Sequence, residues 1–174
     1  MYLVHIENAV KKFYANDSEQ IIRNRQSERT YHFRIAKYLS DEIEINNIVL
    51  DDISKMYIDC EFNMDGQNRK ENNNGNKVYP DIICHNRKYG DDKKNLFAIE
   101  IKVRSSGSDK NKVKEYMDNQ NYSEGYCISN INKNSFTIII INSNNTYQKN
   151  TYIKSSQNSG QFSWSRRQDP PSSL

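Results

Sequence analysis

The segment from residue 78 to residue 103 reads VYPDIICHNRKYGDDKKNLFAIEIKV and decides the fold. It contains two apolar runs with the length and β-branched content of buried strands, residues 79–83 and 96–103. Asp81, Glu100 and Lys102 are the only charged residues inside these runs. A charge in a buried strand is strongly unfavourable unless it is paired, bound to a metal or used for function. These three residues are therefore the first candidates for a functional site.

The spacing of these charges suggests how they meet. Residues two apart in a strand share a face of the sheet, so Glu100 and Lys102 point the same way, and Asp81 joins them if its strand lies alongside. Two carboxylates can hold a hard divalent cation such as Mg²⁺. A lysine beside them can position a water or stabilise charge on a phosphate, which is the chemistry of phosphodiester hydrolysis. The same spacing also permits a buried ion pair with only a structural role, which contributes little net stability.

Helical patterns precede this segment. We expect helices over residues 2–15 and 19–43, with a polar cap between them at residues 16–18. The stretch MYIDCEFNM, from residue 56 to residue 64, predicts a short strand, and the Asn- and Gly-rich residues 65–77 predict a loop.

The chain after the opening segment returns to a helix and two strands. The stretch DKNKVKEYMDNQ, residues 109–120, predicts a helix with Ser108 and Asp109 as caps. The runs YCIS and SFTIIIIN predict two strands joined by a hairpin turn at residues 130–134. We therefore expect an α/β fold in one domain, residues 1–154. Its parts are N-terminal helices at 2–43, and a sheet and third helix at 55–144. From residue 155 to residue 174 the composition shifts to Ser, Gln, Arg and Pro, which predicts an unstructured or vector-derived tail.

Size, charge and cysteine content set broad limits. With 174 residues the chain can bury a hydrophobic core in one domain. A formal net charge of +3 neither requires nor excludes a polyanionic partner. Cys60, Cys84 and Cys127 are dispersed and odd in number, which argues against a disulfide framework or a zinc site and indicates free thiols. No apolar run could span a bilayer and no signal-peptide core is present, so we expect a soluble cytoplasmic protein with no membrane partner.

A resemblance to a known superfamily rests on three parts of the sequence. Pro80-Asp81, the nineteen positions from Asp81 to Glu100, and Glu100-Ile101-Lys102 resemble the PD-(D/E)XK signature of restriction-endonuclease-like nucleases. The predicted order of elements resembles their αβββαβ core. The stretches SERTYHFRIAKYL, DCEFN, YPDIICH, NLFAIEIK and GYCIS resemble small, mostly uncharacterised bacterial members, over roughly residues 20 to 142.

The resemblance implies a restriction-endonuclease-like fold, with a central mixed sheet flanked by helices and a metal-dependent nuclease site. It implies Asp81 and Glu100 as metal-binding acids, Lys102 as the catalytic lysine and the backbone carbonyl of Ile101 as a further metal ligand. The expected cofactor is Mg²⁺, with Mn²⁺ as a substitute, and the expected partner is nucleic acid, DNA in particular. Since cutting both strands of a duplex generally needs two active sites, a homodimer would fit.

Two other classes of function stay open. One is a module of the same fold that binds nucleic acid or a protein without cleaving it. The other is an interaction protein whose charged cluster is only structural. Metal binding would separate the second class from the other two, and a cleavage assay would separate a nuclease from a binding module.

The helix before the sheet supplies further candidates. Glu28 and His32 are four residues apart, so they share a helix face. Nucleases of this superfamily often add an acid from that helix, so we expect Glu28 within one water of Asp81, directly or indirectly on the metal, and His32 at the rim of the same cleft. The alternative is a Glu28 that pairs with His32 or Arg25 on the outside of the helix.

Other polar residues have weaker signals. Lys110, Lys112 and Lys114 alternate along the start of the third helix and could hold phosphates, although a charge run also fits a solvated face. His85 fits a structural or rim position better than a metal ligand. Asp59 and Glu61 could line the cleft, or could equally lie on a solvated edge strand.

Overall fold

The computed structural model describes residues 2–45, 55–62, 64–65, 68–71, 75, 77–88, 90–104, 109–144, 146–156 and 162–173. Within these residues the helices are α1 (Leu3–Asn16), α2 (Ser18–Arg23), α3 (Glu28–Ile45) and α4 (Asp109–Gln120). The strands of the main sheet are β1 (Tyr57–Cys60), β4 (Ile82–His85), β5 (Asn95–Lys102), β6 (Tyr122–Asn132), β7 (Ser135–Ile141), β8 (Thr146–Ser156), β9 (Phe162–Gln168) and β10 (Ser172–Ser173). A small hairpin of β2 (Met64–Asp65) and β3 (Asn68–Arg69) stands apart, and the 3-10 helix η1 (Gly90–Asp92) connects β4 to β5.

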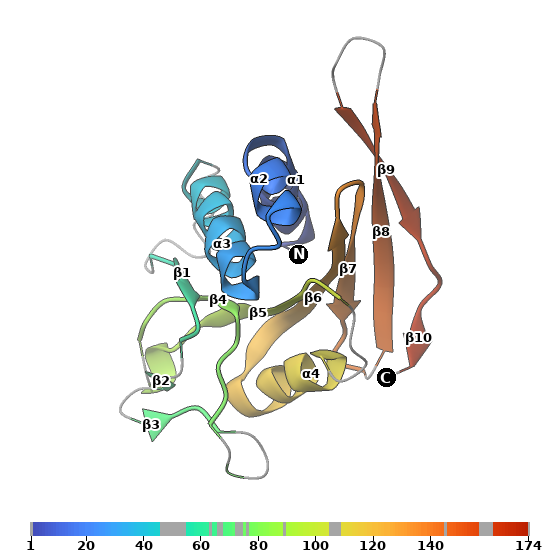
Figure 1. The fold of residues 1–174 in the computed structure, drawn as a ribbon. Coiled ribbons are helices and arrows are strands. Elements are labelled where there is room, and N and C mark those ends of the chain that lie inside the picture. The colour runs from blue at the N-terminus through green and yellow to red at the C-terminus, as the bar shows by residue number, and fades with distance from the viewer. Residues whose placement is uncertain are drawn as a thin grey trace.

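The sheet is open, mixed and mostly antiparallel. Its strand order is β1-β4-β5-β6-β7-β8-β10, and β9 pairs with the other end of β8. Among the described strands only β5 and β6 are parallel neighbours, and α4 makes the crossover that such a pair requires. The structure thus confirms an α/β protein with N-terminal helices, a mixed sheet and a packed helix (Figure 1).

Alternation along the strands gives the sheet two apolar faces. The helices α1 and α3 cover one face and α4 covers the other (Figure 1). The first core contains Ile6, Phe13, Ile35 and Leu39 from the helices and Ile82, Cys84, Phe97, Ile99 and Ile101 from the strands. The second contains Ile83, Ala98 and Cys127 beneath Val113, Tyr116 and Met117 of α4. Glu100 lies between Ile99 and Ile101 in sequence, so it faces α4 rather than the N-terminal helices.

Small residues let α4 lie close to the sheet. Ala98 and Gly125 are neighbours across the parallel pair β5 and β6. A Cβ atom on Gly125 would lie 2.4 Å from Val113 Cγ1 and 2.6 Å from Met117 Sδ, both of α4. Real Cβ atoms essentially never make contacts this short, so a side chain at residue 125 would require α4 to shift.

Two element predictions are wrong in part. The helix expected over residues 19–43 is interrupted between α2 and α3, where Arg25 adopts φ 47°. A left-handed residue cannot continue a right-handed helix, so the chain turns there. The loop expected over residues 65–77 also contains strand structure, namely β3 and the bridge between Glu71 and Lys77. Ser108, expected as a cap of α4, lies outside the described residues.

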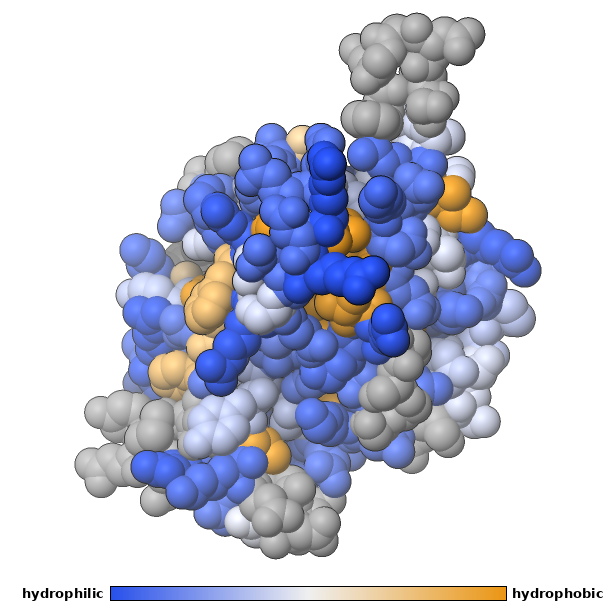
Figure 2. Space-filling view, viewed as in Figure 1, coloured by the Kyte–Doolittle hydropathy of each residue, from blue (hydrophilic) through white to orange (hydrophobic). Residues whose placement is uncertain are grey.

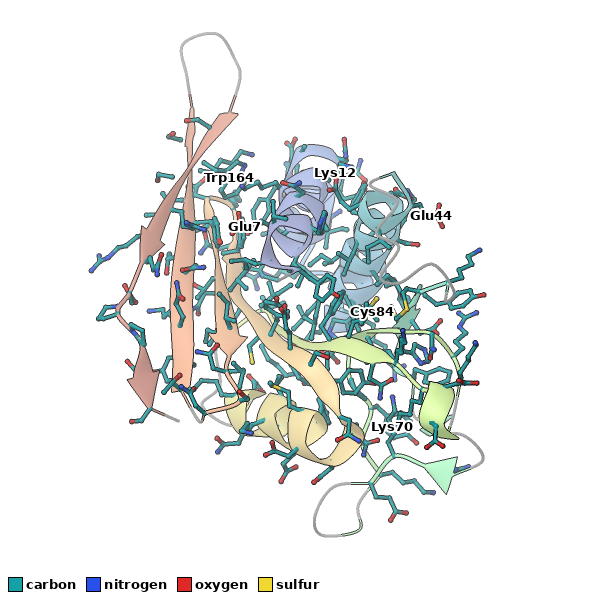
Figure 3. All side chains as sticks on the ribbon, turned by 180° about the vertical axis from the view of Figure 1, so that it is seen from behind. Glu7, Lys12, Glu44, Lys70, Cys84 and Trp164 are labelled. Atoms are coloured by element: carbon teal, nitrogen blue, oxygen red, sulfur yellow. The ribbon has the colours of Figure 1, made fainter. Side chains whose placement is uncertain are left out.

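The predicted tail is a larger error, because residues 162–173 are structured and the domain boundary at residue 154 falls inside β8. The strand β9 pairs with β8 from Asn150–Gln168 to Ser156–Phe162. Trp164 packs edge-on against Tyr14 of α1 and Phe136 of β7, with ring centroids 5.0 and 5.1 Å apart (Figure 3). Backbone pairing and one aromatic anchor order this segment, although its composition is polar.

Two further findings concern the cysteines and possible membrane-spanning helices. Cys60, Cys84 and Cys127 are free thiols, as their spacing predicts. Among the described residues, no helix has both the length and the apolar character to cross a membrane.

Candidate metal centre

Two neighbouring strands hold the central acids. Asp81 directly precedes β4, and the antiparallel register that pairs Ile82 with Ile99 places Asp81 opposite Glu100. Asp81 is 8% exposed and Glu100 only 1%. The backbone N–H of Ile101 donates a hydrogen bond to Asp81 Oδ2 at 2.7 Å, which fixes the Asp81 carboxylate at the edge of β5. The sheet therefore brings together the two acids that the sequence singles out.

The helix α3 adds two more candidate ligands to this edge. His32 Nδ1 lies 3.4 Å from Asp81 Oδ1, and His32 Nε2 lies 3.9 Å from Glu28 Oε1. One ligand atom from each of Glu28, His32 and Asp81 lies within 4.8 Å of the others. Glu28 therefore faces the site, at the distance from Asp81 expected from the sequence. His32, however, is 4% exposed and lies inside the group, so its expected position at the rim is wrong.

His32 is a buried residue of the site whose ring makes no hydrogen bond to the described residues. Both of its ring nitrogens are buried, and neither makes a hydrogen bond to any residue in the described part of the chain. Burial lowers the pKa of His32, which outweighs the opposing effect of the nearby Glu28 charge, so the ring is neutral at pH 7. Buried polar atoms without partners are rare in folded proteins. A cation between Glu28, His32 and Asp81 would give a lone pair of this ring a partner, so the donor set fits a metal.

The acids are held in an environment that resists their negative charges. Burial is the main cause that raises the pKa of Asp81, although the Ile101 N–H lowers it. Burial also raises the pKa of Glu100, and the neighbouring Asp81 charge adds to this effect. The charges of Lys102 and Lys112 lower both pKa values without cancelling these shifts, and a further cation here would favour the ionised carboxylates. This again fits a metal at this edge.

The helix α4 supplies two partners for Glu100: Tyr116, and Lys112, which the sequence proposed as a phosphate-binding residue but not as a partner of this acid. Tyr116 is buried and donates a hydrogen bond from its hydroxyl to Glu100 Oε1 at 2.9 Å. Lys112 Nζ lies 3.5 Å from Glu100 Oε2. The spacing of four residues between Lys112 and Tyr116 is a signal that they share a helix face, but it does not say which strand this face meets.

Lys102 is a stable cation in this structure. Its Nζ donates a hydrogen bond to Glu28 Oε1, which joins β5 to the start of α3. Burial acts to lower the pKa of Lys102, but the hydrogen bond to Glu28 and the charge of Asp81 outweigh it and raise the pKa. Lys102 is therefore suited to stabilising negative charge rather than to accepting a proton.

The remaining candidates lie apart from the centre. Lys110 stands over the ring of Tyr147 at 3.7 Å, and Lys114 pairs with Asp118 on α4. Of the three lysines proposed to hold phosphates, only Lys112 contacts an acid of the site.

The residues of β1 and the end of β4 form a second polar cluster. His85 donates a hydrogen bond from Nε2 to Asp59 Oδ2 at 2.8 Å, and Arg87 pairs with the same carboxylate. Glu61 pairs with Arg29, whose Nε lies 2.9 Å from Glu61 Oε1. Asp59 and His85 therefore satisfy each other, as the structural interpretation of His85 predicts.

Comparisons of the chain with known protein families, with curated proteins and with solved structures find no match in any of the three. The class of protein defined by the fold and the site is an α/β protein with a partly buried cluster of carboxylates, histidine and lysine where β4 begins and β5 ends. Its function must be inferred from these residues.

Proposed function

We propose that the protein is a divalent-metal-dependent nuclease of the restriction-endonuclease-like kind, which hydrolyses phosphodiester bonds, with DNA as the first substrate to test. The observation that carries this proposal is the convergence of Glu28, Asp81 and the unsatisfied His32 beside Lys102. Glu100 lies opposite Asp81 in the register of β4 and β5. The described order α3, β1, β4, β5, α4, β6, with only β5 and β6 parallel, also has the sequence of elements expected for the αβββαβ core.

The residues have distinct roles in this proposal. Asp81 and Glu100 would hold Mg²⁺ or Mn²⁺, with Glu28 and His32 on the α3 side. The carbonyl of Ile101 points to the same edge of β5 as its N–H, which contacts Asp81, so it is available to the same ion. When bound, the ion would lower the pKa of a water and polarise the phosphate.

The lysines would act on the substrate. Lys102 is cationic and lies on the face of β5 that carries Glu100, so it would stabilise negative charge that develops on the phosphate. Lys112 has a side chain that is 51% exposed and could exchange its contact with Glu100 for one with a phosphate oxygen. Tyr116 would keep the Glu100 carboxylate in one orientation through its hydrogen bond.

A second candidate is a module of the same fold that binds without cleaving. The observation that favours it is the pairing already present: Lys102 contacts Glu28, and Lys112 contacts Glu100. Two lysines thus compensate two acids of the site without any metal, as a structural cluster would require.

A cleavage assay tests the proposal. The protein is incubated with supercoiled, linear and single-stranded DNA and with RNA, in Mg²⁺ and in Mn²⁺. We expect cleavage of at least one substrate, and a loss of about 100- to 1,000-fold in rate for Lys102→Ala. Lys114→Ala is the matched control, because Lys114 pairs with Asp118 away from the site. Absence of cleavage under every condition, or full activity of Lys102→Ala, would contradict the nuclease proposal.

A further inference from the structure

Two exposed aromatic side chains are close in sequence to residues of the candidate centre. The large hydrophobic side chains most exposed in the described part of the chain are Val4, Phe33, Tyr79 and Ile153. Phe33 is 56% exposed and Tyr79 is 48% exposed. Both are close in sequence to residues of the site: Phe33 follows His32 on α3, and Tyr79 precedes Asp81 by two residues. Two residues of chain span at most about 7 Å, so the backbone of Tyr79 lies next to that of Asp81.

A series of neighbouring residues links Phe33 to Asp81. Arg29 precedes Phe33 by four residues, so the two side chains are neighbours on the surface of α3. Arg29 pairs with Glu61, and the backbone N–H of Glu61 donates to the carbonyl oxygen of Asp81 at 3.2 Å. Phe33 is thus linked to Asp81 through Arg29 and Glu61, and Tyr79 through two residues of chain.

Part of the centre is exposed to solvent, and two exposed basic side chains pair with acidic residues near it. The side chains of Glu28 and Lys102 are 36% and 29% exposed, whereas those of His32 and Asp81 are 6% and 11% exposed. Arg29 and Lys112, each with more than half of its side chain exposed, pair with Glu61 and with Glu100. The face of the molecule shown in Figure 2 is largely hydrophilic, with apolar side chains in small separate groups. Exposed rings beside exposed cations form a surface for flat groups that carry phosphates.

We infer that the centre takes single-stranded nucleic acid, whose bases stack on Phe33 and Tyr79 while Arg29 and Lys112 contact its phosphates. The inference deepens the proposed function and rests on it for the identity of the substrate. Bases of a single strand offer their flat faces to aromatic side chains, whereas bases of a duplex are already stacked on one another. A single-stranded substrate also needs only one active site, so cleavage would not require a dimer.

Binding measured without cleavage tests the inference. Fluorescence anisotropy of a labelled oligothymidylate, and of the duplex of the same length with oligodeoxyadenylate, is recorded in Mg²⁺ with Lys102→Ala as the background. We expect tighter binding of the single strand, and a loss of about 5- to 100-fold in its affinity on adding Phe33→Ala or Tyr79→Ala. Tyr79→Phe should keep the affinity because it keeps the ring. Ile153→Ala is the matched control, since Ile153 is 47% exposed but lies on β8.

Each result decides the inference. Unchanged single-strand affinity in both alanine variants, equal affinity for the duplex, or no binding of either oligonucleotide would overturn it. Circular dichroism of each variant confirms that a lost affinity is not a lost fold. Cleavage by the wild type combined with ring-independent binding would sink this inference and leave the nuclease proposal standing. Ring-dependent binding by a protein that cleaves no nucleic acid would do the reverse and would identify a binding module.

Discussion

The molecule contains two aspartate–histidine pairs whose carboxylates have opposite pKa shifts, although burial lowers the pKa of both histidines. In the first pair, His85 is buried and hydrogen-bonded to Asp59, and Arg87 adds two contacts to the same carboxylate. In the second, His32 Nδ1 lies 3.4 Å from Asp81 without a hydrogen bond. The residue types are the same, so the difference comes from what surrounds them.

The pKa directions show what this difference means. Burial acts to raise the pKa of Asp59, but the hydrogen bonds from Arg87 and His85 outweigh it and the pKa is lowered. No such set of donors surrounds Asp81, and burial raises its pKa despite the Ile101 N–H. The first pair is complete as it stands and stabilises the fold. The second leaves both ring nitrogens of His32 without hydrogen bonds, which is why we propose it as the site of a ligand.

The largest expected effect is on Mn²⁺ affinity, which should depend on the Asp81 pair and not on the Asp59 pair. Asp81→Asn combined with Glu100→Gln should abolish binding of Mn²⁺ in isothermal titration calorimetry, because both central carboxylates are gone. Asp59→Asn is the matched control, since it changes the other pair, and should bind with the wild-type affinity. Equal affinity of the double variant and the wild type would show that the Asp81 pair is not a metal site.

A smaller effect is expected at Glu28, on the α3 side of the centre. Glu28→Gln should weaken Mn²⁺ binding by about 10- to 100-fold, since a ligand or a group that orients one is lost. Glu42→Gln serves as its control because Glu42, also on α3, pairs with Lys12 of α1. If both variants bind like the wild type, Glu28 only anchors Lys102.

Stability, unlike metal binding, should depend more on the Asp59–His85 pair than on the Asp81–His32 pair. Asp59→Ala leaves the buried His85 and Arg87 without their shared acceptor, so the free energy of unfolding in urea should fall by about 1–3 kcal/mol. Asp81→Asn, measured in EDTA, should lower the free energy of unfolding by less than Asp59→Ala does. It removes a carboxylate whose ionised form is disfavoured by burial. A greater loss at Asp81 than at Asp59 would reverse our assignment of the structural and the functional pair.

The smallest effect is a pH dependence of the metal-free protein. Asp81 and Glu100 have raised pKa values in the folded state, so the folded protein binds more protons than the unfolded chain above about pH 4. Their contribution to stability is therefore present at low pH and is lost as the pH rises towards neutrality. Melting temperatures in EDTA should show a shallower fall over this range for Asp81→Asn with Glu100→Gln than for the wild type. Parallel curves for the two proteins would mean that these acids do not titrate in the fold.

Sequence reasoning found the parts of the centre that lie in strands or directly beside them. Asp81, Glu100 and Lys102 stood out because each interrupts an apolar run, and the period of a strand places Glu100 and Lys102 on one face. The range of α4 was also predictable, since a cap and a helical pattern are local features. The burial of His32 was not predictable, because a helical period gives the direction of a side chain but not its depth.

Contacts between distant elements and the C-terminal strands escaped prediction. Tyr116 and Lys112 reach Glu100 only because α4 lies close over the sheet, which no local pattern reports. The residues around Trp164 are mostly polar, yet they form β9, whose backbone pairs with β8. Backbone pairing does not depend on composition, so a polar edge strand resembles a disordered segment in sequence.

The close approach of α4 at Gly125 has a consequence for genetics. A methyl group there would meet Val113 and Met117, so α4, with Tyr116 and Lys112, would be displaced from Glu100. In a selection for inactive mutants, Gly125 would therefore score like a catalytic position although it has no side chain. Conversely, a second-site suppressor of Gly125→Ala should map to Val113 or Met117, where a smaller side chain restores the space.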